Sequence, residues 1–174
     1  MKISSTRRRR VNLQKSETAI LFSLSGYRFA IAAGAVDEIR PLAGLKEFQP
    51  TVADPRFAKV KHILERQGRR YFVIDTCALF HVPPSDSSRL LLLRNVPAAV
   101  MVDGIEQMHE IETIHALPLA FAGEERRWYR GIALIRGRVV PVVSVEAFLT
   151  RAEAALLSAM TPASGKEAFA EVTA

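Results

Sequence analysis

Two segments of the chain follow one plan: Gly68-Arg-Arg-Tyr-Phe-Val-Ile-Asp-Thr-Cys-Ala-Leu-Phe80 and Gly137-Arg-Val-Val-Pro-Val-Val-Ser-Val-Glu-Ala-Phe-Leu149. Gly, Arg, Val and Ala fall in register between them, and an apolar run follows each Gly-Arg pair. A glycine that opens into β-branched and aromatic residues is typical of a hairpin turn leading into a buried strand. The repeat therefore predicts two similar β-rich halves, and neither segment contains the residues that an enzyme needs.

Turn signals divide the rest of the chain into short elements. Strands are expected over residues 18–24, 27–31, 59–64, 68–75, 89–94, 98–102 and 105–114, with a last hairpin over 129–143. A bend at Ala33-Gly34 precedes a further element over residues 35–40, which Pro41 ends. Residues 82–88 combine two prolines with turn formers, which predicts a linker between structural units. From Val145 onward apolar residues recur at helical spacing, which predicts an amphipathic C-terminal helix with a stripe made of Phe148, Leu149, Ala152, Ala155, Leu156 and Ala159.

Length and composition indicate a globular protein. The 174 residues fit one domain or two small subdomains that share a core, and 49% hydrophobic residues suffice for burial. No apolar run approaches the ~18 residues of a membrane helix, and the N-terminus lacks the apolar segment of a secretory signal. The single cysteine, Cys77, excludes an intrachain disulfide and a multi-cysteine zinc site. A cytoplasmic location is expected.

The net charge of +6 is concentrated at the N-terminus. Residues 1–15 contain six of the 24 basic residues and no acid, so 18 basic residues face 18 acidic ones elsewhere. A nucleic-acid module needs basic residues on a structured face, and the sequence offers none there. Residues 1–17 are expected to form a disordered basic tail that is a solvated arm, with binding to a nucleic acid or a membrane surface as the alternative.

Four segments of the chain, taken in order, form a pattern. The first runs from Ile20 to Arg40, with Val36-Asp-Glu-Ile-Arg40 after an opening hairpin; the second is the segment from Gly68 to Phe80. The third is Val100-Met-Val-Asp-Gly-Ile-Glu106, and the fourth extends from Tyr129 to Leu149 and into a helix. Together they resemble the CheW-like domain family of bacterial chemosensory systems, and the chain is identified as a divergent member of this family.

The resemblance implies a mainly β fold over residues 18–160, with two five-stranded β-barrel subdomains, a C-terminal α-helix, and a flexible tail over residues 161–174. It implies a non-enzymatic adaptor without a cofactor, which couples chemoreceptors to a histidine kinase. The expected partners are the kinase's regulatory domain, the chemoreceptor's cytoplasmic tip and other CheW-like proteins, with recruitment to membrane-bound receptor arrays but no membrane insertion. The alternative is an accessory protein of a non-flagellar system that binds only one of these partners.

One motif departs from the family pattern. Where the family has Asn-Leu-Arg-Gly, this chain has Glu65-Arg66-Gln67-Gly68, so the arginine comes one position early. One step along a strand turns a side chain to the opposite face, which puts a receptor contact through Arg66 in doubt unless a bulge restores it.

An adaptor is expected to bind through apolar patches ringed by charge. Val36 and Ile39 have this arrangement because Asp37, Glu38 and Arg40 flank them, and the alternative is that both are core residues. The candidate partner-binding residues are Val36, Glu38, Ile39, Arg40, Val60, Ile63, Arg66, Gln67, Gly68, Val102 and Asp103.

The titratable residues do not suggest an enzyme or a metal site. His109 and His115 are six residues apart, whereas two metal ligands on one helix face are four apart, and on a strand they would lie about 20 Å apart. Asp75 and Asp103 each lie beside a turn or a helix start, where capping explains them. A regulatory domain detached from a histidine kinase would share the fold, but 174 residues leave no room for the kinase's other domains.

Overall fold

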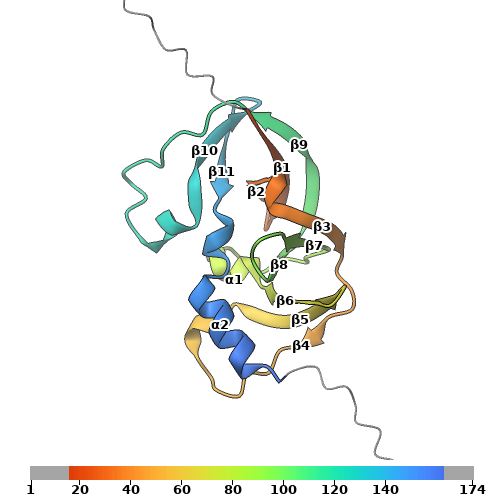
Figure 1. Cartoon of the computed structure of the whole chain (residues 1–174). Coiled ribbons are helices and arrows are strands. Elements are labelled where there is room, and N and C mark those ends of the chain that lie inside the picture. The colour runs from red at the N-terminus through yellow and green to blue at the C-terminus, as the bar shows by residue number, and fades with distance from the viewer. Residues whose placement is uncertain (1–15, 163–174) are drawn as a thin grey trace, which may run out of the picture.

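The computed structural model describes residues 16–162 and contains two β-sheets (Figure 1). The five-stranded sheet consists, in spatial order, of β10 (Tyr129–Ile135), β11 (Arg138–Val143), β2 (Tyr27–Ala32), β1 (Glu17–Leu24) and β9 (Gly104–Ile111). The six-stranded sheet consists of β3 (Val36–Pro41), β7 (Arg89–Leu93), β8 (Ala98–Val102), β6 (Arg69–Ile74), β5 (Val60–Arg66) and β4 (Lys46–Glu47). The helices are α1 (Thr76–Phe80) and α2 (Arg151–Met160), with 3₁₀ turns η1 (Ala33–Ala35), η2 (Pro55–Phe57), η3 (Glu124–Arg127) and η4 (Val145–Ala147).

The repeat seen in the sequence corresponds to one hairpin in each sheet, β5–β6 and β10–β11. Their turns are Gln67-Gly68 and Arg136-Gly137, with φ values of 50° and 73° in the first and 51° and 74° in the second. Two successive positive φ angles are typical of a type I′ turn, whose twist matches that of the flanking strands. The similar halves predicted from the sequence are therefore confirmed at the level of the hairpin.

The two halves are interleaved along the chain. The chain forms β1 and β2, crosses through η1 to the six-stranded sheet, and returns to the first sheet between β8 and β9. Residues 82–88, expected to separate structural units, instead join α1 to β7 within the six-stranded half. Hydrogen bonds fix this segment, since the Ser85 hydroxyl donates to the Asp103 carboxylate at 2.7 Å.

The mainly β fold and the C-terminal helix were predicted correctly, but several boundaries differ. The second sheet has a sixth strand, the two-residue β4, which carries no sequence signal. Glu17, assigned to the N-terminal tail, is the first residue of β1, and β9 ends at Ile111 rather than near 114. Residues 1–15 and 163–174 of the two predicted tails lie outside the described part of the chain.

Three apolar clusters account for the burial. The first lies on one face of the five-stranded sheet and includes Leu21, Ile135 and Val142; the second lies on one face of the six-stranded sheet and includes Leu64, Leu90 and Leu92. The third and largest contains residues of both sheets, such as Ile20, Phe22, Ile31, Phe72, Leu91, Leu93 and Val100. The four leucines of β7 are buried on both faces of the sheet, which explains their unbroken apolar run.

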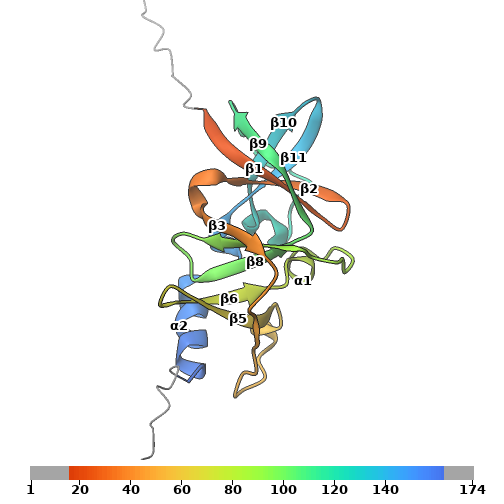
Figure 2. The ribbon, with the colours of Figure 1, turned by 90° about the vertical axis from the view of Figure 1, so that its right-hand side faces the viewer.

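The C-terminal helix α2 lies beside β5 and β6 (Figure 2). It begins later than predicted and buries a different face. Thr150 caps α2, so Phe148 and Leu149 precede the helix and are not in phase with it. Within α2 only Leu157 is buried, while Ala152, Ala155, Leu156 and Ala159 of the predicted stripe are exposed. Among residues 16–162 no helix is long and apolar enough to cross a membrane.

We expect that replacing Gly131 with alanine lowers the free energy of unfolding by about 2 kcal/mol, because overpacking a rigid site costs about 1–3 kcal/mol. An added Cβ would lie 2.3 Å from the backbone oxygen of His115 and 2.6 Å from the Ile114 side chain. Urea unfolding measures the change. Gly34→Ala is the control, since a Cβ there meets no atom within 4 Å, and equal losses for both variants would contradict the steric explanation.

Candidate partner-binding surface

The candidate surface is built on β3, an edge strand of the six-stranded sheet that pairs only with β7. Val36 points into the shared core and is 7% exposed, whereas Ile39 is 41% exposed. The two side chains lie on opposite faces because three positions separate them and side chains alternate along a strand. Of the two apolar candidates on β3, only Ile39 is available to a partner.

Glu38 is held by Arg66 through a bidentate ion pair. Two of the three guanidinium nitrogens of Arg66, Nε and Nη2, each donate a hydrogen bond to the Glu38 carboxylate at 3.1 Å. Three strands (β7, β8 and β6) separate β3 from β5 in the sheet order, so this pair requires the sheet to curve until β3 and β5 approach. The arginine that comes one position early in the sequence therefore lies on the β3 surface.

The Arg66 hydrogen bonds hold the pKa of Glu38 below its usual value. A carboxyl group whose pKa is lower in the folded state stabilises the fold above its unfolded pKa, and this contribution disappears as the pH falls through the folded value. The ion pair is therefore formed at neutral pH and lost in acid. Because the pair is solvent-exposed, it contributes little to stability, and its main effect is to orient the Glu38 and Arg66 side chains relative to each other.

A second group of charges lies around Asp37. Arg69 and Arg94 approach the Asp37 carboxylate at 3.7 Å and 3.8 Å. Arg69 also donates a hydrogen bond to the backbone oxygen of Arg94 at 3.0 Å, which joins the start of β6 to the end of β7. Asp37 and Glu38 of β3, their ion-pair partners Arg66, Arg69 and Arg94, and the exposed Ile39 are together referred to as the β3 surface.

The structure separates the eleven predicted site residues into three groups. Val36, Val60, Ile63 and Val102 are buried in the shared core, so their expected exposure to a partner is wrong. Asp103 has a structural role, since it accepts hydrogen bonds from the Ser25 backbone at 2.6 Å and from Ser85. The residues with side chains or backbone at the surface near β3 or the β5–β6 turn are Glu38, Ile39, Arg40, Arg66, Gln67 and Gly68.

Three members of the β3 surface were not predicted as site residues: Asp37, Arg69 and Arg94. They lie on β3, at the start of β6 and directly after β7, and the pairing of β3 with β7 brings Arg94 close to Asp37. The signal available in the sequence was the arginine that follows each Gly in the repeat, which was interpreted as a part of the hairpin turn.

The histidines and the cysteine are not brought together. Within residues 16–162 no group of three or more His, Cys, Asp or Glu side chains is arranged to hold a metal ion. His109 contacts Gln107, and the backbone of His115 forms a bridge with Ile132. Cys77 is buried, and its sulfur lies 3.2 Å from the Ser85 hydroxyl. Asp75 caps α1, as expected, by accepting a hydrogen bond from the Ala78 backbone.

Comparisons with known proteins agree with this architecture. The crystal structure of the scaffolding protein TtCheW from Thermoanaerobacter tengcongensis superposes with a TM-score of 0.68 at 16% sequence identity, covering 80% of this chain and 97% of that chain. No curated protein sequence shows a significant match. The family model of the CheW-like domain matches residues 18–153. The chain therefore belongs to the CheW-like domain family.

Proposed function

We propose that the protein is a non-enzymatic adaptor that couples a chemoreceptor to a histidine kinase in a bacterial chemosensory system. Membership of the CheW-like family and a fold similar to that of a scaffolding protein support an adaptor role. The observation that carries the proposal is the exposed Ile39, which lies on an edge strand whose acidic residues Asp37 and Glu38 are held in ion pairs. An apolar anchor inside a polar rim is the usual organisation of a protein-binding surface.

The kinase's regulatory domain and the cytoplasmic tip of the chemoreceptor are the proposed partners, with other CheW-like proteins as further ones. The ion pairs of the β3 surface contribute little to affinity while exposed to solvent, because water and salt screen them. Their arrangement favours a partner whose charges complement it, which gives specificity and faster association. Ile39 supplies apolar area that a partner can remove from water.

Replacing Ile39 with aspartate is expected to weaken binding to the partner that uses this surface by about 2 kcal/mol, or roughly thirtyfold, because an unpaired charge is then buried at the interface. Isothermal titration calorimetry with a kinase regulatory-domain fragment and with a receptor-tip fragment from the same cell measures the effect. The melting temperature is expected to change little, since the Ile39 side chain is exposed.

Leu134→Asp is the matched control, because Leu134 is also an exposed apolar residue on a strand but belongs to the five-stranded sheet. If the Ile39→Asp variant has normal stability and binds both fragments as tightly as the wild-type protein does, the β3 surface is not a binding surface for either partner. Loss of binding to one fragment alone, when the other never binds, would favour the accessory protein with a single partner. Binding to nucleic acid that disappears when residues 1–15 are deleted would favour the basic-tail alternative.

A further inference from the structure

The C-terminal helix α2 connects the two halves of the molecule. It follows β11 of the five-stranded sheet, yet Figures 1 and 2 both place it beside β5 and β6 of the other sheet. Leu157 joins the same apolar cluster as Ile63 and Phe72, and Arg70 donates a hydrogen bond to the Pro162 backbone oxygen at 3.2 Å. The helix therefore belongs to one half by sequence and to the other by packing.

Few side chains of α2 are buried against the rest of the molecule, although the helix connects the two halves. Leu157 is the one buried residue among its ten, and Ala154 and Met160 are half-buried. An isolated helix shorter than about 12–15 residues is marginal in water, so α2 depends on its docking for stability. An element with few buried apolar contacts opens locally at a lower free energy than the sheets do.

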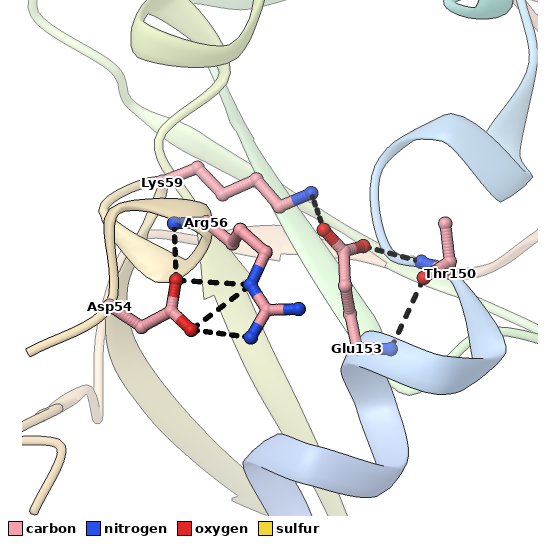
Figure 3. A network of polar contacts seen from close by, with 5 residues as sticks. All are labelled: Asp54, Arg56, Lys59, Thr150 and Glu153. Atoms are coloured by element: carbon pink, nitrogen blue, oxygen red, sulfur yellow. Dashed lines mark hydrogen bonds and ion pairs between the residues drawn. The ribbon is translucent and has the colours of Figure 1, made fainter. Parts of the chain in front are cut away.

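A shielded ion pair supplies a second attachment (Figure 3). The Lys59 ammonium lies 3.0 Å from the Glu153 carboxylate, and the two side chains are only 14% and 19% exposed. Lys59 stands between η2 and β5, on the six-stranded half. The other Glu153 oxygen accepts a hydrogen bond from the Thr150 backbone at 2.8 Å, and the Thr150 hydroxyl accepts one from the Glu153 backbone at 3.2 Å. Glu153 thus both caps the helix and ties its first turn to the opposite half.

The same residues border a cleft between the two halves. Lys59, Thr150 and Glu153 line a cavity of about 710 Å³ together with His81 after α1 and Trp128 before β10. We propose that α2 is a detachable strap and that the Lys59–Glu153 pair is its latch: when the latch opens, α2 leaves the six-stranded sheet and the cleft widens while both sheets stay folded. The proposal does not depend on the adaptor role.

Hydrogen exchange measured by mass spectrometry on the full chain tests the strap. In the wild-type protein the α2 amides are expected to exchange at least about tenfold more often than those of β7, because local opening precedes global unfolding. Lys59→Met removes the ammonium, keeps a similar aliphatic stem, and leaves the capping contacts between Glu153 and Thr150 in place. Glu153 then lacks the ammonium of Lys59, so the exchange of the α2 amides is expected to be about tenfold faster than in the wild-type protein, while the exchange of the β7 amides is unchanged.

Two further variants keep the test decisive. Glu153→Gln weakens the latch but preserves the helix cap, since glutamine also serves at this position, and it replaces Lys59→Met if that variant does not fold. Arg28→Met breaks a more exposed ion pair with Glu106 on the five-stranded sheet and is expected to leave α2 exchange unchanged. The fluorescence of Trp128, the single tryptophan, is expected to shift to longer wavelength in the latch variants as the cleft widens.

The proposal is overturned if α2 and β7 exchange at one common rate in the wild-type protein. It is also overturned if the latch variants accelerate neither element, or accelerate both equally, since the ion pair would then act only on global stability. Selective acceleration of α2 by the latch variants, and not by Arg28→Met, supports it.

Discussion

Replacement of Phe148 by alanine is expected to lower the free energy of unfolding by about 3 kcal/mol or more, which is the usual cost of removing a fully buried phenylalanine ring. Phe148 has no exposed surface, and its ring centroid lies 5.7 Å from that of Phe80. In the sequence Phe148 lies between β11 and α2, and its side chain belongs to the apolar cluster that contains residues of both sheets. A cavity there therefore weakens the contact between the two halves as well as the local packing. Denaturant unfolding of the purified protein measures the loss.

Leu156→Ala is the control for Phe148→Ala. The sequence periodicity assigned both residues to one apolar stripe, but Leu156 is 43% exposed. Its replacement is expected to cost less than about 0.5 kcal/mol, because it removes little buried area from a helix that alanine also favours. If Phe148→Ala lowers the free energy of unfolding by only a few tenths of a kcal/mol, or if the two variants lose equal amounts, the packing of Phe148 in the shared core is contradicted.

Val36→Asp is the second substitution with a large expected effect, a loss of about 3 kcal/mol or more in unfolding free energy. Val36 is 7% exposed and belongs to the shared core, so the variant removes apolar contacts and places a carboxylate in the interior. Ile39→Asp, three residues along the same strand, is expected to leave stability almost unchanged. Melting temperatures of the two variants provide the comparison, and similar melting temperatures would contradict the inward and outward orientations of these side chains.

The strands were predictable because their signals are local. Three hairpin turns consist of a residue at positive φ followed by a glycine, namely Ser25-Gly26, Gln67-Gly68 and Arg136-Gly137, and an apolar run follows each of these turns. The repeat indicated two β-rich halves, and the family resemblance supplied the fold of each half. β4 was missed because two exposed residues that pair with the end of a longer strand produce no periodicity.

The helix face was predicted incorrectly for a physical reason. The spacing from Phe148 through Leu156 is helical, but the capping box formed by Thr150 and Glu153 starts α2 after Phe148 and resets the phase. The Thr-x-x-Glu sequence at 150–153 is the signal that identifies this start. With the helix beginning at Arg151, the buried face passes through Ala154, Leu157 and Met160.

The candidate surface was predictable only in part. The charged residues around Val36 and Ile39 indicated a partner-binding segment, and strand alternation places these two side chains on opposite faces, but only the packing of the sheets shows which of them faces solvent. The pairing of Glu38 with Arg66 depends on the curvature of a sheet in which these residues are far apart in sequence. Val60, Ile63 and Val102 were proposed by analogy with the family, and their burial shows that hydrophobic residues of a strand are first of all core residues.

We propose that this protein bridges two partners, and a mixing experiment with both of them tests this role. The kinase regulatory-domain fragment and the receptor-tip fragment are combined with and without the purified chain, and the complexes are separated by analytical ultracentrifugation. We predict that a complex of all three proteins forms only when the chain is present, and that Ile39→Asp reduces its amount at matched concentrations. If neither fragment binds the chain, or if the two fragments associate to the same extent without it, the adaptor function is wrong.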